Sequence, residues 1–516
     1  MSNASAVFRS LIIYGLVLPL AISLGYLLAT PLDFTTMTVV GIILFILTIP
    51  LFLRWHHPWL FATWNMSAIL FFLPGRPSVW LIVAIISFSI GVLQYVINRD
   101  VKFLNVPSVT RPLLFLGIVV LITMRLTGGI GLKALGSETY GGKNYVLLLT
   151  SIIGYFALIS RQIPPKRVEL YVLLFFIGSI TMAFGDLPLL LPSGFNFLYL
   201  IFPLLQSGAL VQQGVDVVGT SASIRVTGFG FMGMALFGAM LSRYGLRGIF
   251  LEPSKPWRAV LFTAVFFSGL LGGFRSVFIF FMMVMVVLFY MERLYQTRLL
   301  PMLIIVGMLG GTLMIAFANR LPFAVQRSIA FLPINIDPMA RLSATVTTEW
   351  RLQMWKDVLQ EVPQYLILGK GYGFSARDLA MLQDTARGGS GLETTMMAGD
   401  YHNGGLSVII PFGLPGMLGF LWFLWAGLRV TYQNYQFGDP QFHRANSYIF
   451  ALFLVKSFFF FTIFGGLVTD FMQFTGLLGL SISLNGGVAR PVVLDQPKVV
   501  LNRFKLHPGI HRPLGA

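Results

Sequence analysis

Residues 403–428 read NGGLSVIIPFGLPGMLGFLWFLWAGL, an apolar run that contains no Asp, Glu, Lys or Arg. The run is longer than the roughly 20 residues that an α-helix needs to cross the hydrocarbon core of a bilayer. Its prolines and glycines are tolerated in membrane helices. The stretch therefore predicts a membrane-spanning helix, and similar runs recur along the chain.

The composition of the 516-residue chain supports the same class. Hydrophobic residues make up 56% of it, charged residues 11%, and the mean hydropathy is +0.80. Soluble domains carry roughly 25% charged residues. We predict an all-α polytopic membrane helix bundle with about 12–14 transmembrane helices and one long helical extracytoplasmic loop.

Charge and cysteine content exclude several function classes. The net charge of +17 indicates orientation in the membrane and contact with anionic membrane lipids, with no nucleic acid as a partner. The chain has no cysteine, which excludes disulfides, thiolate nucleophiles and Cys-ligated metals. Its six histidines form no HExxH pattern. We expect neither a metal site nor a cofactor.

Hydropathy places the individual spans. The run 10–30 follows Arg9 and is expected to be a retained first helix, because a cleaved signal has a shorter core. The segment 195–211 is apolar but contains Pro203, so we expect a re-entrant or surface helix there. The remaining spans are expected at 34–53, 59–73, 78–97, 112–127, 145–160, 168–184, 228–243, 258–273, 276–291, 300–317, 403–428, 447–466 and 470–487.

Basic residues concentrate in the loops on one side of this arrangement, which predicts that both termini are cytoplasmic. Four parts follow. Residues 1–219 form N-terminal membrane helices, and 220–430 form a domain that includes the outward-facing loop 319–401. Residues 431–488 form C-terminal membrane helices, and 489–516 form a basic cytoplasmic tail.

Three polar residues are expected at the outer ends of three different helices: Arg225, Arg275 and His402. Boundary arginines often only extend their heads to the interface. Arg275, however, has apolar runs on both sides, and such an arginine usually faces a polar cavity. Guanidinium groups bind phosphate oxygens in pairs and stay charged. Two arginines and a histidine on one face suit a diphosphate site.

The polar loop has its own pattern. A helix is expected over 347–362, with Trp350 and Trp355 on its apolar side. It either lies at the membrane interface or packs on the rest of the loop. Arg351 precedes Trp355 by one turn, so it can be aimed back over the membrane site. The glycines of the run 369–373 indicate a tight, irregular turn.

One glycine motif is misleading. Gly228-Phe229-Gly230-Phe231-Met232-Gly233 matches GxGxxG, but a dinucleotide site needs a preceding strand in a βαβ unit. Here the motif begins an expected membrane helix. Small residues there allow close helix packing.

Four short motifs occur in a fixed order around the long loop: Arg225-x-x-Gly228, Phe274-Arg275-Ser276, Arg351-x3-Trp355 with Gly369-x-Gly371-x-Gly373, and His402-Asn403-x2-Leu406 with Gly413-x2-Gly416. Over roughly 220–430 the chain resembles the O-antigen ligase and polymerase family of bacterial membrane glycosyltransferases. Three departures concern the substrate more than the reaction: Phe229-Gly230-Phe231 replaces Asn-Pro-Asn, Phe274 replaces Ser, and Pro411 stands where an acidic residue is common.

The resemblance implies metal-independent, inverting glycosyl transfer at the outer face of the bacterial inner membrane. The donor would be a glycan on undecaprenyl diphosphate. The acceptor would be a lipid-A core sugar for a ligase of lipopolysaccharide, or another lipid-linked glycan for a polymerase. Polysaccharide-assembly proteins are further expected partners. His402 would be the catalytic base, Arg225 and Arg275 would bind the donor diphosphate, and Arg351 and Asn403 would support them.

Two other function classes stay open. A transporter or flippase for lipid-linked glycans also needs cationic groups in a cavity, but such folds commonly show repeated halves, and no internal repeat is evident. A non-catalytic scaffold for envelope assembly is the third. Lys456, in the middle of an apolar run, is a functional candidate by its position, with no partner evident.

Overall fold

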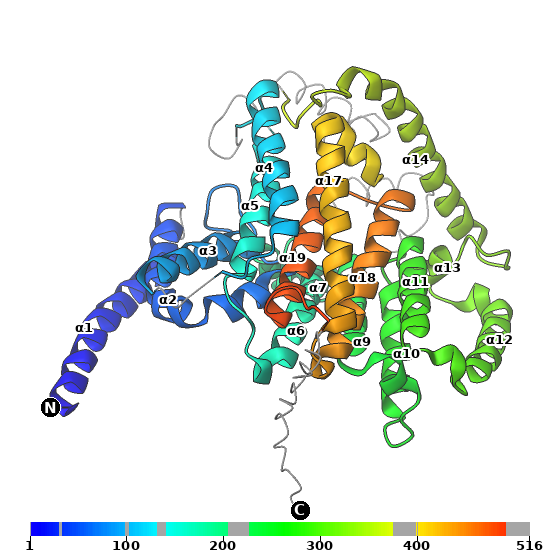
Figure 1. The fold of residues 1–516 in the computed structure, drawn as a ribbon, viewed down its shortest axis with the longest axis horizontal. Coiled ribbons are helices and arrows are strands. Elements are labelled where there is room, and N and C mark those ends of the chain that lie inside the picture. The colour runs from blue at the N-terminus through cyan, green and yellow to red at the C-terminus, as the bar shows by residue number, and fades with distance from the viewer. Residues whose placement is uncertain are drawn as a thin grey trace, which may run out of the picture.

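The computed structural model describes residues 2–29, 34–98, 103–131, 141–204, 226–374, 399 and 401–491. This part of the chain is almost entirely helical (Figure 1). Its regular strand pairing is limited to a single antiparallel bridge between Ile69 and Ser78. In lipid, a helix satisfies its backbone hydrogen bonds internally, which is why such an apolar chain folds in this way.

The α-helices are α1 (Ser2–Ala29), α2 (Phe34–Thr63), α3 (Val79–Ile97), α4 (Pro107–Thr127), α5 (Gly142–Leu158), α6 (Val168–Ile177), α7 (Thr181–Leu190), α9 (Thr227–Phe250), α10 (Trp257–Leu270), α11 (Arg275–Met291), α12 (Leu299–Phe317), α13 (Phe323–Ser328), α14 (Pro338–Tyr365), α17 (Gly404–Phe437), α18 (His443–Thr462) and α19 (Leu467–Asn485). Short 3-10 helices connect them: η2 (Pro165–Arg167), η3 (Gly178–Ile180), η4 (Ser193–Leu200), η5 (Leu294–Gln296), η6 (Ala318–Arg320) and η7 (Pro440–Phe442).

Seven of the described helical segments are long and apolar enough to cross a membrane, or eight if the bent α2 counts as one span. They comprise α3, α4, the α6–α7 unit, α12, α17, α18 and α19. The apolar helices α5, α10 and α11 coincide with expected spans but have only 14 to 17 residues. The predicted all-α polytopic membrane bundle is confirmed.

Two expected helices in the N-terminal half differ. The predicted span 59–73 is wrong, because α2 continues from Phe34 and ends at Thr63. Helix α2 is bent by 106° at a break between Thr48 and Phe52 that contains Pro50, and Pro58 lies in the second arm. Proline removes a helix hydrogen bond and clashes with the preceding turn. Of the expected helix 195–211, the structure shows only the short η4, and residues from 205 onwards lie outside the described part.

Helices α17, α18 and α19 form the centre of the bundle (Figure 1). At one end, the Asn434 amide donates to Ser481 Oγ over 3.0 Å, and the Asn446 and Asn485 amides exchange hydrogen bonds of 2.9 Å. At the other end, the backbone N–H of Leu467 donates to the Ser407 hydroxyl over 3.1 Å. The α18–α19 loop is thereby held beside the start of α17.

Helix α14 runs across this second end of the bundle (Figure 1). Asp337 caps it by accepting a hydrogen bond of 2.8 Å from the Met339 N–H, a common way to satisfy a helix start. The helix is longer than the predicted 347–362. Its buried Met354 and Val358 pack on Ile410 of α17. This face therefore packs on α17, whereas the prediction named the membrane interface or the rest of the loop.

Candidate functional site

The candidate site lies where α14, the start of α17 and the α18–α19 loop meet. His402 has a φ of +50°, a left-handed conformation that is uncommon for a residue other than glycine. Asn403 follows and caps α17, because its Oδ1 accepts a hydrogen bond of 3.1 Å from the Leu406 N–H. Strained backbone of this kind is concentrated at functional sites. The cap holds the strained residue at the end of a rigid helix.

The imidazole of His402 lies among aromatic rings. Its centroid is 5.0 Å from that of Phe464, with 29° between the planes, and 5.7 Å from that of Trp350. The side chain is partly exposed. Phe464 comes from the α18–α19 loop and Trp350 from α14. Two separate elements therefore fix the orientation of one imidazole ring.

The Arg351-x3-Trp355 spacing has a direct structural explanation. The indole N–H of Trp355 donates to the backbone carbonyl of Tyr401 over 2.8 Å, so α14 holds the residue before His402. One turn earlier, the Arg351 guanidinium lies over the Phe464 ring at 5.5 Å from its centroid. Residues four apart lie on the same face of a helix. Arg351 and Trp355 thus both face the His402 turn.

Arg275 is the first residue of α11 and approaches the same helix. Its Nη2 donates to the Thr348 hydroxyl over 2.8 Å and to the Ala344 carbonyl over 3.0 Å. Thr348 lies one turn before Arg351 on α14. No carboxylate of the described chain lies within ion-pair distance of Arg275. The structure thus brings Arg275, Arg351 and His402 together around α14.

Arg225 lies outside the described residues, but the glycines after it are visible. A Cβ on Gly233 would lie 2.4 Å from the Gly269 nitrogen of α10, and one on Gly230 would lie 3.0 Å from the Gly272 Cα. This confirms the prediction that the GxGxxG motif serves helix packing. At Gly228, a Cβ would lie 2.1 Å from the Met182 carbonyl oxygen.

Sequence reasoning missed Asp186 of α7, which binds the start of α9. Its buried carboxylate accepts hydrogen bonds from the backbone N–H groups of Gly228 at 2.6 Å and Phe229 at 3.2 Å. It therefore caps the start of α9 with a negative charge, which the helix dipole favours. An acidic residue beside an apolar run was the available signal.

The glycine run after α14 forms the predicted tight turn. Gly369 and Gly371 have φ values of +79° and +67°. A Cβ on Gly369 would lie 2.2 Å from the Pro411 carbonyl oxygen, and one on Gly371 would lie 2.1 Å from the Thr127 hydroxyl. The turn packs between the kink of α17 and the end of α4. Its glycines are explained by close backbone packing.

Lys456 forms an ion pair with Asp470 of α19. Its Nζ lies 2.6 Å from Asp470 Oδ1, and both side chains are largely buried. The other carboxylate oxygen accepts a hydrogen bond of 2.9 Å from the Gly466 N–H. The pair therefore connects α18 and α19 next to the loop that carries Phe464.

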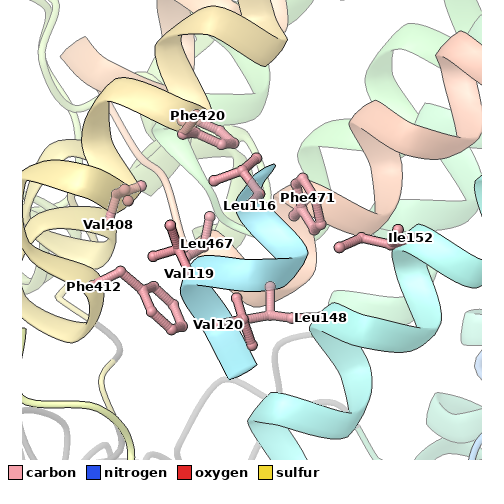
Figure 2. A pocket seen from close by; sticks show the side chains of 11 residues that line it. Leu116, Val119, Val120, Leu148, Ile152, Val408, Phe412, Phe420, Leu467 and Phe471 are labelled. Atoms are coloured by element: carbon pink, nitrogen blue, oxygen red, sulfur yellow. The ribbon is translucent and has the colours of Figure 1, made fainter. Parts of the chain in front are cut away.

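The described part of the bundle contains a small apolar cavity of about 20 Å³ between α4, α5, α17 and α19 (Figure 2). Leu116, Val408, Phe420 and Leu467 are among its lining residues. A cavity of this size has room for about one water molecule, and an apolar one stays dry. It does not contain the polar groups of the candidate site and cannot hold a substrate.

Among the described residues, no three His, Asp or Glu side chains come together as a metal-binding group. A scan against protein-family models finds no match for the chain, and a search of the curated proteins finds none. The functional assignment therefore rests on these residues and their geometry.

Proposed function

We propose that the protein is a membrane glycosyltransferase of the O-antigen ligase or polymerase type. It would transfer or polymerise a glycan from an undecaprenyl-diphosphate-linked donor onto a sugar acceptor at the outer face of the bacterial inner membrane. The observation that carries the proposal is the packing of both His402 and Arg351 against Phe464, with Arg275 bound to the same helix α14.

In the proposed reaction, His402 accepts the proton of the acceptor hydroxyl, since histidine is the side chain most often used as a general base. The hydroxyl oxygen forms a bond to the anomeric carbon as the bond from that carbon to the diphosphate oxygen breaks. The lipid diphosphate leaves with the electron pair. Attack opposite the leaving group inverts the anomeric centre.

The arginines would stabilise the leaving group. Diphosphate departs more readily when its developing charge is neutralised, and fixed cations in a site of low dielectric do this strongly. Arg275 is positioned by two hydrogen bonds to α14. Arg225, assigned from the sequence, would be the second cation. Arg351 would position a phosphate or sugar beside His402.

The test is a transfer assay with purified protein, a lipid-linked donor and an acceptor. We expect His402→Ala to lower the rate by about 10²- to 10⁴-fold, the usual contribution of a general base. His443→Ala is the matched control, because His443 is exposed at the opposite end of α18. Normal transfer by His402→Ala protein would refute the proposed base.

A gene deletion distinguishes a polymerase, a ligase and a flippase. Single repeats on the cell surface indicate a lost polymerase. Full-length chains that remain on the carrier lipid indicate a lost ligase. Donor that accumulates at the cytoplasmic face would instead identify a flippase.

A further inference from the structure

Arg327 is a buried cation that none of the motifs includes. It lies in α13 and is only 6% exposed. Its Nη2 donates to the Thr347 hydroxyl over 2.9 Å, and its Nη1 is shielded from solvent without a hydrogen-bond partner. A guanidinium has five N–H donors. Arg327 therefore retains donors that the described chain does not use.

The charge of Arg327 also lacks a counter-ion in the part of the chain that the structure describes. No Asp or Glu within the described ranges lies at ion-pair distance from it. A buried charge without a partner is strongly destabilising, so buried charges are normally paired. By contrast Arg258, the other buried arginine in the described core, lies 2.6 Å from Glu252. The arrangement at Arg327 is that of a site whose anion comes from outside the described part of the chain.

Arg327 of α13 and Arg275 of α11 both bind α14, at neighbouring residues. The two arginines donate to the successive threonines Thr347 and Thr348. Hydroxyls on successive helix residues are separated by roughly 6 Å, given a turn of about 100° per residue. Helix α13 also packs on the α10–α11 turn, where the Ser328 hydroxyl donates to the Leu270 carbonyl over 3.3 Å. Both guanidinium groups are thus fixed relative to one backbone.

Each of the two threonines accepts one hydrogen bond from an arginine and leaves the other N–H donors of that guanidinium to other partners. The Thr347 hydroxyl donates to the Ser343 carbonyl at 2.7 Å, and the Thr348 hydroxyl donates to the Ala344 carbonyl at 3.0 Å. Each hydroxyl therefore uses its hydrogen on the helix backbone and accepts from an arginine. The threonines position the two guanidinium groups without neutralising them.

We infer that Arg327 and Arg275 together form a binding subsite for a diphosphate group. This inference rests on the proposed function, because it names the residues that would bind the leaving group of the donor. Two guanidinium groups that bind successive residues of one helix match two linked phosphates better than one carboxylate. Arginine binds phosphate oxygens with paired, charge-assisted hydrogen bonds. Arg327 is then a donor-binding residue in addition to Arg275.

The test uses the full-length protein in lipid nanodiscs and two probes, inorganic pyrophosphate and farnesyl diphosphate. Affinity is measured by calorimetry, and folding is checked by thermal unfolding. Loss of a charge-assisted hydrogen bond weakens binding by at least about tenfold, so we expect that loss in Arg327→Gln. Arg258→Gln is the control, because Arg258 is a buried arginine at the start of α10, at the opposite end from the α10–α11 turn, and its replacement should leave both affinities unchanged.

A second variant covers the case in which Arg327→Gln does not fold. Arg327→Met replaces the buried charge by an apolar chain, and such replacements are often neutral or stabilising. We expect pyrophosphate to raise the unfolding temperature of the wild type and not that of Arg327→Met. An equal increase in both proteins, or no binding of either probe to the wild type, would overturn the inference.

The two probes also distinguish the sources of the diphosphate. Equal wild-type affinity for both supports a subsite for diphosphate alone, and tighter binding of farnesyl diphosphate supports a lipid-linked ligand; each outcome requires the dependence on Arg327. Arg327-dependent binding without transfer from any donor would refute the proposed function and leave the subsite standing. Full transfer with a diphosphate affinity that is independent of Arg327 would refute the subsite and leave the proposed function standing.

Discussion

The imidazole of His402 stacks on the ring of Phe464, with 5.0 Å between the ring centroids, and the guanidinium of Arg351 lies over the same Phe464 ring. One aromatic side chain from the α18–α19 loop therefore orients two candidate functional groups from two other elements. Phe464 has no polar atom and belongs to no motif, which is why sequence reasoning did not select it.

Phe464→Leu should lower the transfer rate while the fold persists. The change removes the flat ring that both groups contact, and each cation–π or aromatic contact contributes about 0.5–2 kcal/mol. We expect about a tenfold or larger decrease in rate, measured in the transfer assay beside thermal unfolding. Phe458→Leu is the control, because Phe458 is 54% exposed on α18. Equal rates in the two variants would contradict the role of Phe464.

Trp355→Phe tests the hydrogen bond that holds the residue before His402. The variant keeps an aromatic ring but loses the donor to the Tyr401 carbonyl, which costs about 1–3 kcal/mol if the carbonyl stays buried. We expect a lower kcat with an unchanged affinity for diphosphate. Trp422→Phe, at a half-exposed position on α17, should change neither. A selective loss of donor affinity in Trp355→Phe would assign this residue to binding instead.

Gly404→Ala and Gly405→Ala form a matched pair at the start of α17. A Cβ on Gly404 would lie 2.3 Å from the Phe460 ring and carbonyl oxygen, whereas one on Gly405 would meet its nearest neighbour at 3.4 Å. Overpacking costs about 1–3 kcal/mol, so Gly404→Ala should lower the unfolding temperature and the transfer rate. Gly405→Ala should be neutral or slightly stabilising, since alanine favours the helix. Similar unfolding temperatures would show that this contact can relax.

Lys456→Met should destabilise the protein because it leaves the Asp470 carboxylate buried without its partner. Removal of one member of a buried pair costs about 3–5 kcal/mol. The double variant Lys456→Met/Asp470→Leu should recover much of that loss, as measured by denaturant unfolding in detergent. Lys370→Met removes the more exposed pair with Glu361 and should cost at most about 1 kcal/mol. A double variant as unstable as the single one would argue against an uncompensated charge.

Transfer should continue in excess EDTA. The proposal assigns the neutralisation of the diphosphate to arginines, whose charge is permanent. The measurement is the initial rate with and without chelator, after dialysis of the protein against chelator. A rate that falls with EDTA and returns on addition of Mg²⁺ would overturn the metal-independent mechanism.

The class of fold was predictable because lipid imposes one solution on an apolar chain. Local signals also succeeded where the cause was local: the glycines at 228–233 and 369–373 indicated close packing and a tight turn, and both are present. The bend in α2 was missed although Pro50 lies at the break. Proline is common in membrane helices, so hydropathy alone did not show where the chain leaves the helix.

The contacts of the site were less predictable because they join distant positions. Lys456 seemed isolated in the sequence, since its partner Asp470 lies on the next helix and meets it only after α18 and α19 pair. Arg327 looked like one of many charges in a polar loop, and only the docking of α13 under α14 shows that it is buried. Periodicity predicts which face of a helix is apolar but does not identify what covers it.

The glycine contacts between α9 and α10 have a consequence for how the protein sits in lipid. Because the two backbones touch at Gly233 and Gly269, one helix cannot slide along the other by even one residue, about 1.5 Å, without a steric clash. A change in bilayer thickness is then met by the surrounding lipid or by the tilt of outlying helices such as α12. The position of Arg275 relative to α9 and α10 is then set by the polypeptide and not by the lipid around it.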